Sequence, residues 1–244
     1  PFQRNMCLGM MLKVISFTVK EKNHMSKKHL VKSTTIVASC TMFSRLFGFA
    51  RDMIVAQLFG ASIGVDAFLV ANKIPNFMRR LFAEGAFSQA FVPVLSEFPK
   101  TKSESEIKQF INHVTGVLSL SLFLITILGV LFAPVVIMVF APGFVHDGPR
   151  FELSESMLRI TFPYLLFISL PALSGAILNS YDRFAVPAFT PVLLNFSLIA
   201  CALWLSPHMA QPITALAIGV FIAGIVQLIF QFPFLLKLRR LPIP

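Results

Sequence analysis

The stretch TMFSRLFGFARD, residues 41–52, lies inside the first long apolar segment of the chain and carries Arg45, Arg51 and Asp52. The second apolar segment carries further charges, among them Asp66, Lys73, Arg79, Arg80 and Glu84. A charge at the centre of a bilayer costs roughly 3 kcal/mol on insertion scales, so charges in membrane segments usually face a watery cavity or a partner. The two segments together predict one wall of a cationic cavity inside a membrane.

The composition is that of an integral membrane protein. Of the 244 residues, 56% are hydrophobic and 13% are charged, and the mean hydropathy is +0.77. The net charge of +10 does not indicate a nucleic-acid partner, because the Lys and Arg residues lie between or within apolar runs. Cys7, Cys40 and Cys201 show no paired spacing and no zinc-site pattern, so we expect neither a metal nor another cofactor.

Six apolar segments are long enough to cross a bilayer, which takes about 20 helical residues. They cover residues 33–59, 63–98, 106–140, 153–180, 186–205 and 213–236. The predicted fold is therefore an all-α integral membrane domain at 33–240, preceded by a segment at 1–32 and followed by a tail at 241–244. The second and third segments exceed one bilayer thickness, and Pro75 and Gly85 are the expected bends in the second.

Basic residues flank every second boundary between these segments. They lie before the first segment and after the second, fourth and sixth: Lys27, Lys28, Lys32, Lys100, Lys102, Lys108, Arg183, Lys237, Arg239 and Arg240. Short loops rich in Lys and Arg stay in the cytoplasm, so both termini of this multi-pass protein are predicted to be cytoplasmic. Residues 1–24 are excluded from the fold, because Met25 looks like a natural start and the earlier apolar run is too short to span.

The charges in the first two segments follow a helical stripe. Arg45 and Asp52 are seven residues apart and lie on nearly one face, with Arg51 about 120° to the side. Asp66, Lys73 and Arg80 also recur every seven residues. Guanidinium groups bind phosphate oxygens bidentately and stay charged when desolvated, so the stripe favours a site for an anionic ligand. Structural ion pairs, or side chains that reach the headgroups, remain the alternative.

Other polar and proline positions favour structural interpretations. Asn195, Gln227 and Gln231 are interpreted as hydrogen-bonding residues between helices. Pro163, Pro171 and Pro191 are interpreted as helix kinks. These positions are therefore left out of the predicted site.

Residues 41–52 are followed along the chain by Asp66-Ala67-Phe68, Lys73-Ile74-Pro75-Asn76, Arg79-Arg80 and Phe82 to Pro93. Residues 41–52 resemble the first helix of the MurJ/MviN lipid II flippases of the MOP exporter superfamily, and the later motifs follow in the order of that family. Ala141-Pro142-Gly143-Phe144, Thr161-Phe162-Pro163-Tyr164 and Gly175-Ala176-Ile177-Leu178-Asn179 extend the match, so that it covers roughly Met25 to Arg240.

The resemblance implies a transporter, not an enzyme, in the cytoplasmic (inner) membrane of bacteria, where it serves peptidoglycan biosynthesis and cell shape. Its substrate would be lipid II, the undecaprenyl-diphosphate-linked precursor, and membrane lipids would surround it. The resemblance assigns substrate binding to Arg45, Arg51, Arg79, Asp66 and Arg80. It assigns gating or polar support to Ser44, Asp52, Asn76 and Glu84.

Family members have two lobes of helices, and the chain resembles the amino-terminal lobe alone. We therefore expect a carboxy-terminal lobe to be the missing partner, because alternating access needs two bodies that move about a shared site. A multidrug-type exporter lobe, a membrane scaffold or truncated product, and a membrane enzyme acting on polyprenyl phosphates are the alternatives. The enzyme is disfavoured, since the sequence shows neither clustered metal-binding acids nor an acid/base pair.

Overall fold

The computed structural model describes residues 27–81 and 103–238, and all regular structure within these ranges is helical. The chain divides into two compact units, residues 1–39 and residues 40–244, with the boundary inside helix α2 (Lys27–Phe59). The account below concerns the second unit. The predicted segment at 1–24, the predicted bend at Gly85 and the site residue Glu84 lie outside the described residues.

The remaining helices follow the predicted apolar segments, but two segments are broken. The helices are α3 (Ile63–Arg79), α5 (Glu104–Leu131), α6 (Ala133–Phe140), α7 (Gly148–Thr161), α8 (Tyr164–Ser180), α9 (Ala185–Ala200) and α10 (Thr214–Lys237). Short 3₁₀ turns lie at Pro142–Phe144 and Ser206–His208, and a π turn lies at Cys201–Leu205.

Proline explains both breaks. The third predicted segment is interrupted at Phe132, where Pro134 occupies the first turn of α6. The fourth is interrupted at Phe162 and Pro163, between α7 and α8. A proline has no N–H to donate, so it is tolerated in a first helical turn and disrupts the hydrogen bonding of a helix interior. Pro75, Pro171 and Pro191 lie inside continuous helices, so kinks at these three positions stay a prediction.

Four stretches of the described residues are long and apolar enough to cross a membrane: Glu104–Leu131, Gly148–Ser180, Ala185–His208 and Thr214–Lys237. Helix α2 is long enough, with 33 residues, but its hydroxyl and charged side chains make it less apolar. Helix α3 is described for 17 residues. The all-helical membrane fold is confirmed, whereas a count of six crossings stays a prediction.

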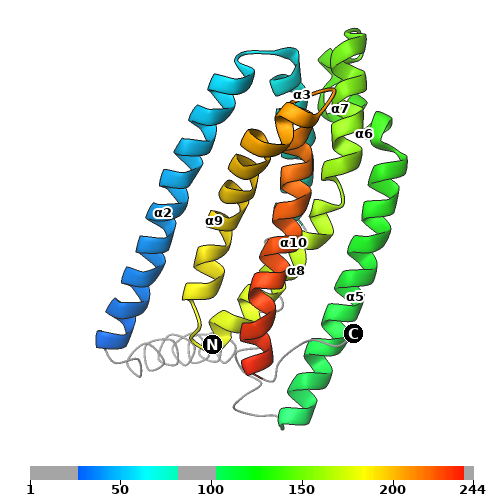
Figure 1. Cartoon of the computed structure of the whole chain (residues 1–244). Coiled ribbons are helices and arrows are strands. Elements are labelled where there is room, and N and C mark those ends of the chain that lie inside the picture. Colours follow the sequence, from blue (N-terminus) through cyan, green and yellow to red (C-terminus); the bar gives the residue numbers. More distant parts are fainter. Residues whose placement is uncertain (1–26, 82–102, 239–244) are drawn as a thin grey trace, which may run out of the picture. The chain divides into compact units, whose positions relative to one another are not determined.

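Helix α10 packs against α7, α8 and α9, and α3 packs against α7 and α8 (Figure 1). The core between these helices contains fully buried Ile74, Met157, Leu165 and Leu216. Many large apolar side chains are instead exposed, including Val139, Trp204 and Ile229. Such an exposed apolar surface suits contact with lipid chains.

A buried polar network joins α9 to α10. The Gln227 amide nitrogen donates to the Thr190 carbonyl oxygen at 3.2 Å, and the Gln231 amide nitrogen donates to Thr190 Oγ1 at 2.9 Å. Thr190 Oγ1 in turn donates to the Val186 carbonyl at 3.1 Å. Both glutamines are 1% exposed. The interpretation of Gln227 and Gln231 as interhelical hydrogen-bonding residues is confirmed.

Replacement of Thr190 by valine should therefore destabilise the α9–α10 contact. The substitution preserves the shape of the side chain but leaves the buried Gln231 amide without its acceptor, at a cost of about 1 kcal/mol. Thermal unfolding of the detergent-solubilised protein would measure the loss, and Thr190→Ser, which retains the hydroxyl, is the matched control. Equal unfolding temperatures for the valine variant and the parent chain would contradict this assignment.

Candidate anion-binding site

The face of α2 that carries Arg51 is hydrogen-bonded to Asn195 of α9. Ser44, Gly48 and Arg51 are spaced four and three residues apart, so they lie on the same side of α2. Asn195 of α9 meets this side: its amide nitrogen donates to the Ser44 carbonyl oxygen at 3.0 Å, and its Oδ1 accepts from Arg51 Nη1 at 2.9 Å. Asn195 is therefore a helix–helix hydrogen-bonding residue, as interpreted from the sequence.

The Arg51 guanidinium is also paired within its own helix. Its Nε and Nη2 donate to Oδ1 of Asp52 at 3.0 and 2.7 Å. A guanidinium has five N–H groups. The two bonds to Asp52 and the one bond to Asn195 use three of them. Two donors remain, one on each terminal nitrogen, without a partner in the described part of the chain. The Arg51 side chain is 28% exposed, so its neighbours cover it only in part.

The other predicted site residues occupy varied environments. Arg45 and Arg80 are exposed, and Arg79 is half-buried at the last residue of α3. Asn76 bonds within α3, since its amide nitrogen donates to the carbonyl and side-chain oxygens of Asn72 at 2.8 and 3.1 Å. The structure thus brings Ser44, Arg51 and Asp52 together around Asn195. A single site that also includes Arg45, Arg79 and Arg80 stays a prediction.

Asp66 has a partner that sequence reasoning missed. Its Oδ2 lies 3.4 Å from Arg150 Nη2, and this ion pair joins α3 to the first turn of α7. Arg150 Nε also lies 3.4 Å from Asp147 Oδ2, and Asp147 Oδ1 accepts from the Arg150 backbone N–H. The available signal was that Arg150 is the basic residue in an otherwise acidic loop, opposite the predicted cytoplasmic face.

Asn195 was left out of the predicted site because its hydrogen-bond partner could not be identified from the sequence. An amide in an apolar helix indicates a hydrogen bond to some neighbour, but the sequence does not say to which one. Its partner Arg51 is 144 residues away in the chain. The polar interruption of the apolar segment at 186–205 was therefore the available signal.

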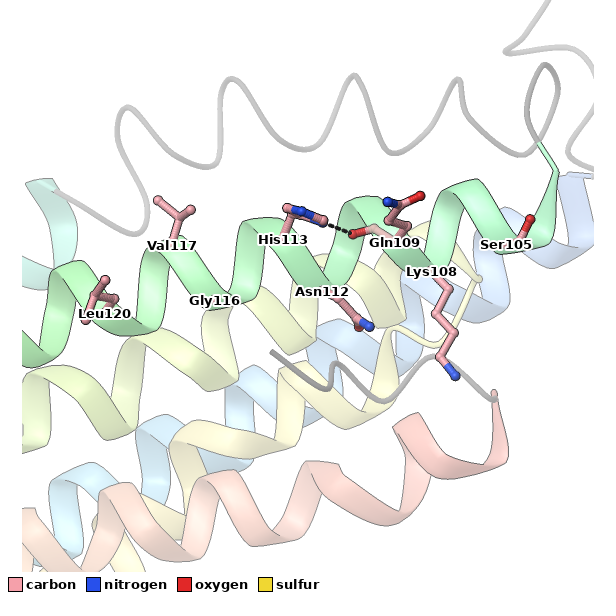
Figure 2. A pocket seen from close by; sticks show the side chains of 8 residues that line it. All are labelled: Ser105, Lys108, Gln109, Asn112, His113, Gly116, Val117 and Leu120. Carbon is pink, nitrogen blue, oxygen red and sulfur yellow. Dashed lines mark hydrogen bonds between the residues drawn. The ribbon is translucent and has the colours of Figure 1, made fainter.

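A shallow pocket of about 690 Å³ lies along one face of α5 (Figure 2). Its described lining consists of Ser105, Lys108, Gln109, Asn112, His113, Gly116, Val117 and Leu120. A ring nitrogen of His113 lies 3.0 Å from the Gln109 carbonyl oxygen of the same helix. Within residues 27–81 and 103–238, none of the predicted site residues lines this pocket, so its described lining shares no residue with the Arg51 site. Across the described residues, no group of three or more His, Cys, Asp or Glu side chains could hold a metal ion.

Comparison with known proteins places these features in a family. The family model described as "Lipid II flippase MurJ" matches residues 55–244. The "Probable lipid II flippase MurJ" of Vibrio cholerae is 50% identical over 217 residues, covering 86% of this chain and 41% of that protein. The "Lipid II flippase MurJ" of Burkholderia cenocepacia is 42% identical over 215 residues, covering 88% and 42%. The chain spans about two fifths of the length of these relatives.

A solved structure gives the same assignment. The "Lipid II flippase MurJ, inward closed conformation" aligns with a TM-score of 0.71 and 34% identity, covering 83% of this chain and 42% of that one. The family resemblance drawn from the motifs is confirmed. Because the family model matches most of the chain and both relatives are more than 40% identical to it, the chain belongs to the lipid II flippase MurJ family.

Proposed function

We propose that this chain forms the amino-terminal lobe of a lipid II flippase, which moves the lipid-linked peptidoglycan precursor from the cytoplasmic to the periplasmic leaflet. The family membership supports the proposal, and the Arg51 geometry carries it. A guanidinium in an apolar segment is held by Asp52 and Asn195, with one N–H on each terminal nitrogen left over. That arrangement suits an anion with two adjacent oxygens, such as a diphosphate.

The chemistry required of such a site is binding and release. Arg51 would donate two charge-assisted hydrogen bonds to the diphosphate, while Asp52 offsets part of the positive charge. Partial neutralisation matters because a transporter must release its substrate on the far side. No bond of the substrate is made or broken, so the site needs no nucleophile, general base or metal.

Transport also requires a second body. Alternating access is the movement of two bodies about a shared central site. The relatives are more than twice as long as the part of them that this chain matches. We assign the second body to the part of the relatives beyond the match, a carboxy-terminal lobe. The exposed apolar side chains of α5, α6, α9 and α10 would meet membrane lipids.

The experiment that tests the function is complementation in a bacterial strain depleted of its lipid II flippase. Residues 25–240 would replace the matching part of the Vibrio cholerae relative, giving a chain of full family length. Growth on depletion, with the hybrid present in the membrane, is the expected result. A hybrid that folds and inserts but does not sustain growth would overturn the proposal.

We further propose that the protein lies in the bacterial cytoplasmic membrane with both termini in the cytoplasm. The support is the alternation of basic and non-basic boundaries along the chain. Reporter fusions after Arg183 and after Lys237 should give cytoplasmic signals, whereas a fusion within residues 206–211 should give a periplasmic one. A periplasmic signal after Lys237 in an inserted, intact chain would contradict the six-span arrangement.

A further inference from the structure

Asn195 is buried in an apolar helix, yet both ends of its amide are used by another helix. It is 6% exposed, and the two bonds it makes reach the Ser44 carbonyl oxygen and Arg51 Nη1 on α2. A buried hydrogen bond that served only to hold the helices together could end on any donor or acceptor. Here the acceptor oxygen is committed to a side chain of the anion-binding site.

The two bonds fix the orientation of the amide. The Ser44 carbonyl accepts and so selects the nitrogen of the Asn195 amide, which leaves Oδ1 facing the guanidinium. If the amide were reversed, its N–H groups would face the N–H groups of Arg51 and its oxygen would face a carbonyl oxygen. The Ser44 carbonyl therefore sets the atom that Asn195 presents to Arg51.

Gly48 leaves room for this contact. It lies one turn after Ser44 on the same side of α2, and a Cβ at this position would lie 3.5 Å from the Asn195 amide nitrogen. That distance is ordinary van der Waals contact, so alanine fits there, whereas a branched side chain would displace the amide. Helix α2 thus supplies both a support, the Ser44 carbonyl, and a space, at Gly48, for Asn195.

Fixing the guanidinium before the substrate arrives has an energetic consequence. A free arginine side chain has considerable rotamer entropy, much of which is lost when it binds a ligand. Asp52 and Asn195 restrain Arg51 from different helices, so most of that cost is met during folding. Preorganisation of this kind strengthens binding without any new contact to the ligand.

We propose that Asn195 is a positioning residue for substrate binding, which acts through Arg51 by aiming its two remaining N–H donors at the diphosphate of lipid II. The inference rests on the proposed function. Asn195 would not touch the substrate itself. Its role would be distinct from that of Gln227 and Gln231, whose amide nitrogens donate to Thr190 of α9.

A double-mutant cycle on the full-length hybrid, reconstituted in nanodiscs, tests the inference with lipid II as the probe. Asn195→Ala should weaken lipid II binding about tenfold in the parent background. In the Arg51→Ala background it should cause no further loss, because the group that it positions is gone. Thermal unfolding of each variant reports on the structural effect of the change separately from binding.

Two further variants keep the test decisive if Asn195→Ala folds poorly. Gly48→Val should displace the amide and weaken binding in the same direction, whereas Gly48→Ala is the matched control and should bind normally.

Equal losses from Asn195→Ala with and without Arg51 would show a merely structural role and overturn the inference. Normal binding by Asn195→Ala would do the same while leaving the function intact. A parent hybrid that does not bind lipid II would instead overturn the proposed function, and the inference with it.

Discussion

Replacement of Arg51 by alanine, in the full-length hybrid, is expected to lower lipid II transport by at least about 100-fold. On the proposed function, the substitution would remove two charge-assisted hydrogen bonds to the diphosphate, each worth about 1.5–3 kcal/mol. A tenfold change in affinity corresponds to about 1.4 kcal/mol. It also leaves the Asp52 carboxylate without its partner, which adds repulsion toward an anion. Complementation and a reconstituted flipping assay would measure the loss.

Arg51→Lys should recover little of the activity. An ammonium group is a point charge and cannot hold Asp52, Asn195 and two phosphate oxygens in one plane. Arg159→Ala is the matched control, because this exposed arginine pairs with Glu155 one turn earlier in its own helix, at 2.7 Å. Normal transport by Arg51→Ala, at normal membrane levels, would refute the cationic site.

Arg45→Ala and Arg79→Ala should also abolish complementation if all three arginines form one cavity. The described hydrogen bonds support a binding role for Arg51 more directly than for Arg45 or Arg79. Wild-type growth by the single variants at Arg45 and Arg79 would restrict the site to Arg51 and its neighbours. Full growth with all three arginines changed to alanine would exclude any role for the charged stripe.

The sequence predicted the helices well and their interruptions poorly, for a physical reason. Length and hydropathy identify a membrane helix, but neither reveals a break inside an apolar segment. Pro134 and Pro163 lie at breaks, whereas Pro171 and Pro191 lie within helices. The difference depends on whether neighbouring groups satisfy the backbone groups that proline frees, which is a property of the packed structure.

The site shows the same division between local and distant information. The pairing of Arg51 with Asp52 is local and could be proposed from their adjacency. The contacts of Arg51 with Asn195 and of Asp66 with Arg150 join distant parts of the chain. A single sequence indicates that a buried polar side chain needs a partner, but only the packing of helices identifies that partner.

Gly129→Ala is expected to have the largest effect on stability. Gly129 is buried in α5, and a Cβ added there would overlap the ring of Phe162. Phe162 is 4% exposed and lies at the break between α7 and α8, within the main apolar core, so its ring has little room to move. Overpacking of this kind costs about 1–3 kcal/mol, which lowers the unfolding temperature by roughly 2–12 °C in a chain of this size.

A compensating substitution distinguishes this clash from a loss of glycine flexibility. Phe162→Leu removes ring atoms that the new methyl group would meet, so the double variant Gly129→Ala with Phe162→Leu should unfold at a higher temperature than Gly129→Ala alone. Gly143→Ala is the control, because a Cβ at Gly143 would meet nothing within 4 Å. If Gly129→Ala were as stable as Gly143→Ala, α5 could not lie against Phe162 as closely as the structure places it.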